Sequence, residues 1–361
     1  MATQIDERER GVSIDETKLM DFLGKVVGDV GAAMSGALVV LGDKLGIYKA
    51  LAAAGASTAS ELAKRTGVAE RYLREWLANQ AAGGYVSYDA QTGRYALPPE
   101  QAAALADESS PAFVPGLFQV AQAVWAGEPR IEERFRTGEG VAWGDQAHCL
   151  FEGTERFFRS GYVGNLVQSW LPALEGVVAK LERGAQVADV GCGHGASTIL
   201  MAQAFPRSKF VGFDSHEESI KTANERARKA GVADRLRFEV AGATDYPGRY
   251  DLVAYFDCLH DMADPIGAAR HTRKSLADDG TWMVVEPFGN DRVEDNLNPV
   301  GRLYYAASTT LCVPCSLAGN GPALGAQAGA SRLKGVISEG GFSRVRVAAQ
   351  TPFNYVFEAR P

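Results

Sequence analysis

The sequence predicts an α/β protein, in which a Rossmann-like, mainly parallel sheet follows an N-terminal α-helical winged-helix domain. Two observations lead to this fold class. From residue 185 onward, strand-like apolar runs alternate with helical segments, which is typical of a parallel sheet with helices on both faces. Residues 58–95 instead show two short helical segments followed by a β-hairpin pattern. The chain has 361 residues, which is enough for two domains.

The composition is that of a globular protein. Hydrophobic residues make up 46% of the chain and charged residues 22%. The chain has no run of about 18 uninterrupted apolar residues and no apolar secretory core at its charged N-terminus, so we expect neither a membrane span nor export. The formal net charge of −7 disfavours a general nucleic-acid binder. Five cysteines, an odd number, fit a reducing compartment, and we expect a cytoplasmic protein.

The first part of the chain is predicted to consist of a tail and a helical domain. Residues 1–16 are polar, and we expect a flexible tail. Residues 17–105 are expected to form a helical, winged-helix dimerisation domain, which begins with apolar residues at helical spacing from Lys18. A second apolar helix is expected from Ala33 to Leu51. Its small residues near 31–37 would let another helix approach closely, so it is either a tightly packed core helix or a subunit interface.

Residues 58–95 have the pattern of a winged helix. Thr58 and Glu61 form a capping-box sequence at the start of one helix, and a second helix ends before the hairpin. This arrangement is usually associated with DNA. Over residues 58–82, however, four basic and three acidic residues leave a net charge of only +1, whereas a helix that faces phosphates normally carries more positive charge. We therefore expect a structural or dimerising wing, and nucleic-acid binding is disfavoured.

The rest of the chain is predicted to contain a connector and the sheet domain. Residues 106–175 are rich in aromatic residues without strand alternation, so we expect a helical connector that also walls a pocket. Residues 176–361 are expected to form the sheet domain, with an antiparallel hairpin at its edge because no helix separates the last two strands. Residues 287–331 are too long for an ordinary βα loop, and we expect them to fold over the ligand as part of a substrate pocket.

The most informative segment is the glycine-rich string VADVGCGHGAS over residues 187–197. Glycines between a strand and a helix allow a tight turn and let a ligand approach the backbone. The string also fits a weak dinucleotide fingerprint, so the loop alone does not choose the cofactor. Asp189 lies at the strand end, where a carboxylate repels a pyrophosphate and suits a cationic amino-acid group. Asp214 ends the next strand, where it can accept hydrogen bonds from ribose hydroxyls of either cofactor.

At these residues the chain resembles the class I methyltransferases that depend on S-adenosylmethionine (SAM), and the resemblance covers residues 185–361. The N-terminal unit resembles the dimerisation domain of two-domain O-methyltransferases. Within this class the chain is similar to an actinobacterial-type, winged-helix group of undefined substrate. The strings that carry this similarity are VADVGCGHGAST, FDCLHDM, NLNPVGRLYYAAST, GAQAG and TPFNYVFEARP. The resemblance implies a Rossmann-like class I methyltransferase sheet, SAM as cofactor and a homodimer.

The resemblance also implies a set of residues that bind the cofactor. Gly191 and Gly193, with Asp189, would line the methionine end of SAM. Asp214 would take the ribose hydroxyls, with Ser215 beside it. The adenine would face Gly242 and Ala243, and since many relatives have an aspartate in place of Gly242, backbone contacts must replace a side-chain bond there. Phe256 either packs on the cofactor or belongs to the core.

Candidate catalytic residues follow the fourth strand of the sheet. His260 lies just past that strand, where plant-type O-methyltransferases have their base histidine, and Glu286 matches the acidic partner that orients it. A histidine with a pKa near 6.5 suits a general base at neutral pH. The alternative is that His260 only braces its loop through a hydrogen bond. Cys312 and Cys315 form a lone C-x-x-C, which is too few ligands for a structural zinc, so no metal site is expected.

The sequence therefore predicts SAM-dependent methyl transfer to a small-molecule acceptor, apolar or aromatic, with oxygen as the favoured methylated atom. The alternative is a winged-helix transcriptional regulator that uses the methyltransferase fold as a SAM sensor. A third reading, an NAD-dependent oxidoreductase, fits less of the sequence. The sequence does not identify the acceptor.

Overall fold

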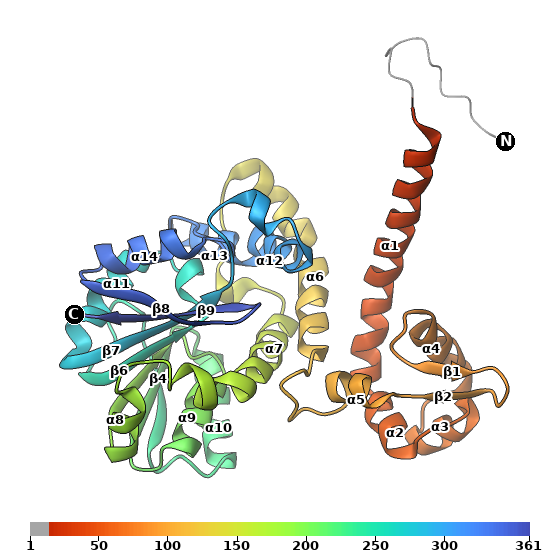
Figure 1. Cartoon of the computed structure of the whole chain (residues 1–361), viewed down its shortest axis with the longest axis horizontal. Helices are drawn as coiled ribbons and strands as arrows, with labels where there is room; N and C mark the ends of the chain where they lie inside the picture. The colour runs from red at the N-terminus through yellow and green to blue at the C-terminus, as the bar shows by residue number, and fades with distance from the viewer. Residues whose placement is uncertain (1–13) are drawn as a thin grey trace. The chain divides into compact units, whose positions relative to one another are not determined.

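The computed structural model describes residues 14–361, so most of the tail predicted over residues 1–16 lies outside the described part. The chain forms two compact units, Met1–Ala106 and Asp107–Pro361 (Figure 1). The boundary lies within one residue of the predicted end of the helical domain. The predicted connector over residues 106–175 is part of the second unit and not a separate body.

The first unit is helical with a short hairpin. Its elements are α1 (Glu16–Lys44), α2 (Ile47–Ala54), α3 (Ala59–Thr66), α4 (Glu70–Ala82), β1 (Ser87–Asp89), β2 (Arg94–Ala96) and α5 (Pro99–Leu105). The capping box at the start of α3 is present, because Thr58 accepts from the Glu61 amide and Glu61 accepts from the Thr58 amide. Strands β1 and β2 pair antiparallel, with Ser87 opposite Ala96. Helices α3 and α4 with this hairpin form the winged helix that the sequence predicts.

Three basic residues of the winged helix form ion pairs with its acidic residues. Arg71 pairs with Glu75 at 2.6 Å, and Arg94 pairs with Glu61 at 2.8 Å. Arg74 pairs with Glu70 one turn away on α4. These pairs offset part of the positive charge that phosphate contacts would need.

The prediction of two helices between Lys18 and Leu51, divided near Ala33, is wrong, because one helix of 29 residues, α1, runs from Glu16 to Lys44. Asp15 caps the first turn of α1. The flexible tail predicted over residues 1–16 therefore wrongly includes Asp15 and Glu16, which belong to the start of this helix. Glycine lowers helix stability by only about 1 kcal/mol per residue relative to alanine, so the helix continues through its glycines.

Helix α1 exposes an unusual amount of apolar surface. Its exposed large apolar side chains are those of Leu19, Met20, Phe22, Leu23, Val26, Val27, Val30, Met34 and Leu41. Added Cβ atoms at Gly24, Gly28 and Gly31 would meet nothing within 4 Å. Among residues 14–361, α1 is also the one helix long and apolar enough to cross a membrane, with a mean hydropathy of 1.5 in its most apolar window. Length and composition alone are weak grounds for a membrane span.

The second unit contains a seven-stranded sheet. Its strands are β3 (Gln186–Val190), β4 (Lys209–Asp214), β5 (Leu236–Val240), β6 (Tyr250–Phe256), β7 (Leu276–Pro287), β8 (Arg344–Gln350) and β9 (Asn354–Arg360). The strand order is β5-β4-β3-β6-β7-β9-β8. The first five strands along this order pair in parallel, whereas β9 pairs antiparallel with β7 and β8. All seven strands and the antiparallel edge agree with the sequence prediction.

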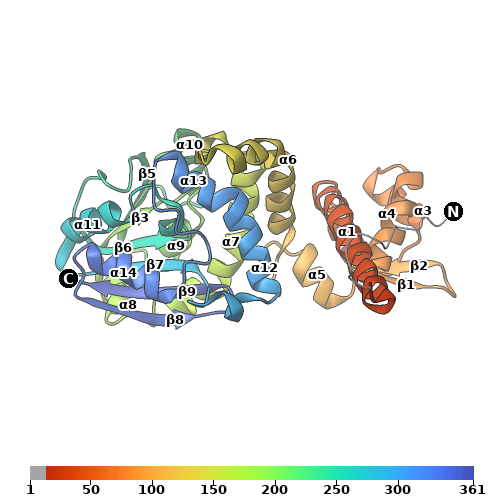
Figure 2. The same cartoon turned by 90° about the horizontal axis from the view of Figure 1, so that it is seen from above.

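Helices cover both faces of this sheet (Figures 1 and 2). The helices and helical turns of the unit are α6 (Pro115–Thr137), η2 (Trp143–Asp145), α7 (Cys149–Asn165), η3 (Leu166–Trp170), α8 (Val177–Arg183), α9 (Ala196–Ala204), α10 (Glu217–Lys229), η4 (Leu259–Asp261), α11 (Pro265–Ser275), η5 (Val293–Asn296), α12 (Pro299–Ala307), η6 (Ser308–Cys312), α13 (Val313–Ala318) and α14 (Ala330–Glu339). Helices α8, α9 and α10 lie on one face, and α11 and α14 lie on the other.

Side chains of each strand alternate between the two faces, because successive residues of a strand point to opposite sides. On β7, Met283 and Val285 pack with α8, α9 and α10, whereas Trp282 and Val284 pack with α11 and α14. Both faces of the sheet are therefore buried, and ligands have access only at the strand ends. The carboxyl ends of the parallel strands are the usual binding edge of such a sheet.

Candidate cofactor and acceptor site

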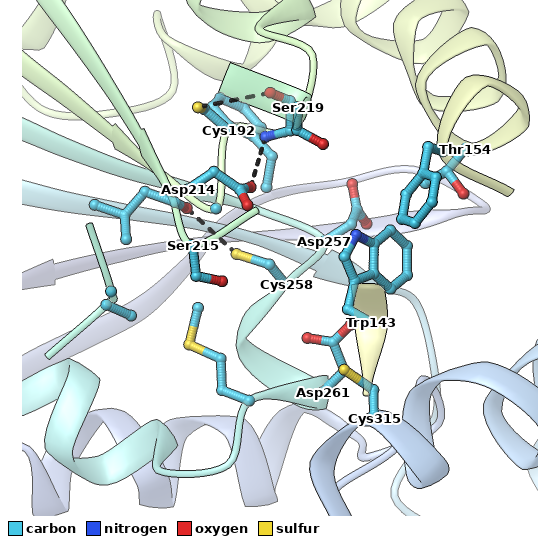
Figure 3. A pocket seen from close by; sticks show the side chains of 18 of the residues that line it. Trp143, Thr154, Cys192, Asp214, Ser215, Ser219, Asp257, Cys258, Asp261 and Cys315 are labelled. Carbon is cyan, nitrogen blue, oxygen red and sulfur yellow. Dashed lines mark hydrogen bonds between the residues drawn. The ribbon is translucent and has the colours of Figure 1, made fainter. Parts of the chain in front are cut away.

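A cavity of about 600 Å³ lies within the second unit at the carboxyl ends of the parallel strands. One part of its wall comes from the turns that follow β3, β4, β5 and β6, which include the glycine-rich loop. The other part comes from α7, the segment before it, the residues after η4, and α13. Its volume falls in the usual range for small-molecule sites. Figure 3 shows three carboxylates around the same space: Asp214 at the end of β4, Asp257 directly after β6, and Asp261 at the end of η4.

The glycine-rich loop follows β3 in a conformation that requires glycine. Gly191, Gly193 and Gly195 have φ values of +74°, +51° and +80°, which side-chain-bearing residues rarely adopt. A Cβ on Gly191 would lie 2.7 Å from the Cys258 sulfur, whereas a Cβ on Gly193 would meet nothing within 4 Å. Gly191 is therefore needed for packing as well as for backbone conformation. The bare backbone at Gly193 leaves room for a ligand at the cavity wall.

Asp214, at the end of β4, holds the glycine-rich loop and faces the cavity. Its Oδ2 accepts a hydrogen bond from the Gly193 amide at 2.9 Å, and its Oδ1 accepts one from the His216 amide at 2.9 Å. A carboxylate has about four acceptor sites, so two remain for hydroxyl groups of a ligand. Burial raises the pKa of Asp214, although both amide hydrogen bonds oppose that rise.

Asp189 differs from the sequence prediction that it lines the methionine end of the cofactor. Its side chain is fully buried and does not belong to the cavity wall. It accepts hydrogen bonds from the hydroxyls of Ser197 and Thr198, each at 2.6 Å. Burial raises its pKa to about 6. Asp189 therefore ties β3 to the first turn of α9 and supports the glycine-rich loop from behind.

The remaining predicted cofactor residues lie together in the cavity wall. Ser215, Gly242, Ala243 and Phe256 all line it. The Gly242 amide already donates to Asp245 at 2.8 Å, so this amide is not free to contact a base. The Phe256 ring lies 5.1 Å from the Tyr162 ring and is largely buried, so Phe256 both packs in the core and forms part of the cavity wall.

His260 and Glu286 form the pair that the sequence predicts, but they do not line the cavity. The His260 Nδ1 atom lies 2.6 Å from the Glu286 Oε2 atom, and their side chains are 5% and 0% exposed. The Glu286 Oε1 atom accepts from the Leu259 amide at 2.8 Å. Burial lowers the pKa of His260, but the Glu286 carboxylate and the Cys312 side chain raise it more, so it lies well above its ordinary value.

These contacts do not match the predicted role of His260 as a general base. A raised pKa favours the protonated ring, and a protonated imidazole has no nitrogen lone pair that could accept a further proton. The ring also lies behind the cavity wall, with Glu286 on one nitrogen and Cys312 close to the rest of the ring. The geometry agrees better with the alternative in which His260 braces its loop.

Asp261 is a cavity residue whose role the sequence did not indicate. It ends η4, directly after His260, and lies beside Trp143 and Cys315 (Figure 3). Burial raises the pKa of Asp261 to about 7, and the Glu286 and Asp214 carboxylates add to the rise that His260 opposes. The one sequence signal of Asp261 was its position next to the predicted base.

Asp257 instead has the bracing role that its position suggests. It has a φ of +52° and accepts hydrogen bonds from the Tyr162 hydroxyl at 3.1 Å and the Asn354 side chain at 2.8 Å. Asparagine and aspartate tolerate this left-handed conformation better than most residues. The two bonds join β6, α7 and β9 at the edge of the cavity.

The charge of the cavity distinguishes between the cofactors that the glycine-rich loop allows. Five carboxylate residues line it, namely Glu155, Asp214, Asp257, Asp261 and Asp264. Within residues 14–361, no Lys or Arg side chain is part of this wall. A pyrophosphate would meet carboxylates with no cation to balance it, whereas a sulfonium would be stabilised. The residues present therefore fit SAM, with ribose hydroxyls at Asp214 and the bare backbone of Gly193 beside it.

Comparison with known families agrees with this assignment. Residues 33–107 match the Rv2258c-like winged HTH domain, and residues 181–312 match a methyltransferase domain. The chain is 29% identical over 169 residues to 27-O-demethylrifamycin SV methyltransferase of Amycolatopsis mediterranei. That match covers 44% of this chain and 57% of the relative, so the chain spans little more than half the length of that curated protein.

Two solved structures extend the likeness to the whole fold. Mitomycin 7-O-methyltransferase is 21% identical with a TM-score of 0.64, over 96% of this chain and 100% of that one. Human N-acetylserotonin methyltransferase, solved in complex with SAM, is 16% identical with a TM-score of 0.69, over 97% of this chain and 99% of that one. At these identities the likeness shows the fold. Together with the two domain matches, it assigns the chain to the class I, SAM-dependent methyltransferases. Within that class, the chain joins an Rv2258c-like winged helix to its methyltransferase domain.

Proposed function

We propose that this protein transfers a methyl group from SAM to a hydroxyl oxygen of a small, largely apolar acceptor. The observation that carries the proposal is the acidic cavity at the carboxyl ends of β3, β4 and β6, next to the glycine-rich loop. When bound, SAM supplies a methyl carbon on a sulfonium, which an acceptor oxygen displaces in line. The protein then has mainly to align the two reactants.

The cofactor would be held by residues from three strand ends. Asp214 accepts from the ribose hydroxyls with the acceptor sites that its two amide hydrogen bonds leave open. Gly191 and Gly193 let the methionine part approach the backbone, and Asp189 keeps this loop in place from behind. Ser215, Gly242 and Ala243 surround the nucleoside, and Phe256 supplies an apolar wall.

We assign the His260–Glu286 pair a positioning role. Glu286 holds both the ring of His260 and the backbone amide of Leu259, and so fixes η4. That turn places Asp261 at the cavity. With a pKa of about 7, Asp261 is able to accept the proton that a hydroxyl loses at neutral pH. The proton thus passes to Asp261 in this proposal, and not to His260.

The acceptor end of the cavity has an apolar wall. Trp143, Phe151, Phe158 and Tyr162 contribute aromatic side chains, and the Trp143 and Phe151 rings lie 5.6 Å apart. Cys315 and Ala318 line it from α13, which belongs to the long segment that the sequence predicts over the ligand. Such a wall favours a planar or lipid-like acceptor, since aromatic rings prefer to pack on flat apolar groups.

We also propose a homodimer formed through α1. Within the described part of its own unit, large apolar side chains of this helix remain exposed, and its glycines leave room for a second helix. An apolar surface of this length on a soluble protein normally marks an interface. The small-residue stretch predicted as a core helix or an interface fits the second role better, because most of it is exposed.

Incubation with SAM and a panel of hydroxylated aromatic compounds tests the proposed activity. We expect S-adenosylhomocysteine (SAH) to form together with one product that is one methylene heavier than its acceptor. Methylation of an amine or thiol in place of a hydroxyl would contradict the assignment to oxygen. Formation of SAH without any methylated product would contradict the transfer itself.

A further inference from the structure

Three of the carboxylates that line the cavity differ in how they are engaged. Glu155 forms an ion pair with Arg226 at 2.8 Å. Asp264 caps α11, because it accepts from the Gly267 amide at 2.7 Å. For Asp261, no ion pair with Lys or Arg is found within residues 14–361, and no side chain there donates a hydrogen bond to it. The acceptor end therefore contains one carboxylate that is left for a ligand.

No positive side chain balances these groups where the acceptor would lie. Trp143 and Cys315, which carry no charge, lie beside Asp261 (Figure 3), and the uncharged Met262 and Ala318 line the same cavity. Arg226 is held by Glu155 and is not part of the wall. An anionic group that entered this end would lose its water and meet carboxylates, with no Lys or Arg side chain of the described wall to balance it, which is unfavourable.

We infer that the acceptor is an uncharged or cationic hydroxyl compound, and that Asp261 excludes acceptors with a carboxylate or phosphate. This inference rests on the proposed function, since it concerns the second substrate of the same site. A hydroxyl or a protonated amine provides the donor that Asp261 lacks, whereas a carboxylate on the acceptor adds repulsion. Specificity of this kind comes from a penalty on the wrong ligand as much as from contacts with the right one.

Cys315 provides a probe of this charge that needs no knowledge of the acceptor. Its thiol lines the cavity, and the Asp261 carboxylate contributes to its raised pKa. The protein is treated with methanethiosulfonates that carry a trimethylammonium, a methyl or a sulfonate group, and labelling at Cys315 is followed by peptide mass mapping. The raised pKa slows all three reactions alike, so the ratio of their rates reports the local potential.

Each labelling rate at Cys315 is first divided by the rate of the same reagent with a free small thiol. We expect this relative rate to be at least tenfold higher for the cationic reagent than for the anionic one. Asp261→Asn should reduce that ratio severalfold, because it removes the carboxylate whose charge acts on the Cys315 thiol. The matched control is Asp291→Asn, which removes a carboxylate that accepts from Ser331 outside the cavity. A ratio equal to that of the free thiol, a preference for the anion, or no labelling by the neutral reagent would each overturn the inference.

Binding of matched catechols tests the same inference on ligands. Dopamine, 4-methylcatechol and 3,4-dihydroxyphenylacetate share a ring and differ in the charge of the side group. With SAH bound, we expect the first two to bind at least tenfold more tightly than the third, and Asp261→Asn to narrow this difference in affinity. Equal or tighter binding of the anion, or no binding of the two others, would overturn the inference. SAH binding is measured first, without any catechol. A protein that does not bind SAH would contradict the proposed function, whereas the catechol results with SAH bound test only this inference.

Discussion

The His260 Nδ1 atom lies 2.6 Å from the Glu286 Oε2 atom, in a place where both side chains are almost completely buried. The sequence predicts this pair, and the structure places it behind the cavity wall and not in it. A buried ion pair depends on both partners, because removal of one leaves the other charge without compensation. The pair therefore matters first for the shape of η4.

Stability should depend on this pair in a pH-dependent way. The pKa of His260 is raised above its unfolded value of about 6.5, so its contribution to stability is complete below about pH 6.5 and is lost as the pH rises through the folded pKa. Glu286→Gln should lower the free energy of unfolding by about 3–5 kcal/mol at pH 6, and by less at high pH. Urea unfolding at both pH values measures this. A loss that grows with pH would contradict the assignment.

Turnover should depend on Asp261 as the group that takes the proton. Its pKa is about 7, so the single-turnover rate should rise with pH through that region. Asp261→Asn should remove this inflection and lower the rate by about 10²- to 10⁴-fold. His260→Ala should lower the rate but keep an inflection, because Asp261 remains. Loss of the inflection in His260→Ala, with its retention in Asp261→Asn, would restore the histidine as the base.

Asp214 should contribute directly to cofactor affinity. Asp214→Ala removes both the ribose contacts and the bond to the Gly193 amide, and hydrogen bonds to charged groups are worth roughly 1.5–3 kcal/mol. We expect SAM and SAH affinities to fall by about tenfold or more in calorimetric titrations. Asp234→Ala, which removes an exposed carboxylate paired with Arg235, serves as the control. An unchanged affinity in Asp214→Ala would mean that the ribose lies elsewhere.

Cofactor binding should release protons. Burial raises the pKa of Asp214 and of Asp261, and a cation in the same cavity favours their charged forms and lowers both values. SAM affinity should therefore increase with pH between about 6 and 8, whereas the affinity of SAH, which lacks the sulfonium charge, should change less. Titrations in buffers of different ionisation enthalpy count the released protons. Equal proton release for the two ligands would contradict this account.

The α1 surface should control the oligomeric state. Val27 and Met34 are exposed apolar residues of this helix, so Val27→Asp with Met34→Asp should convert the dimer into a monomer. Light scattering after size exclusion measures this. Tyr72→Asp changes an exposed residue of α4 and should leave the dimer intact. A dimer that survives both changes on α1 would place the interface elsewhere.

The sequence predicted the features of this fold that depend on local patterns. Strand runs, the glycine-rich loop and the capping box of Thr58 and Glu61 are each decided by a few neighbouring residues, and the structure has all of them. The continuity of α1 was missed because glycines weaken a helix without ending it. The direction of Asp189 was missed because it depends on the hydroxyls of Ser197 and Thr198 on the next helix.

The cavity wall was harder to predict because it depends on segments distant in the sequence. His260 and Asp261 are adjacent in the chain, yet one faces the core and the other the cavity. Only the packing of η4 against Glu286 of β7 decides which of the two faces a ligand. The charge of the site likewise emerges only when α7, η4 and α11 come together around it.

The central claim is that the acidic cavity binds SAM, and calorimetric titration of the intact protein with SAM and with NAD⁺ tests it most directly. The account predicts saturable binding of one SAM per chain and no binding of NAD⁺, because the cavity wall has carboxylates and no Lys or Arg side chain within residues 14–361. Binding of NAD⁺ with equal or higher affinity, or the absence of SAM binding, would contradict it.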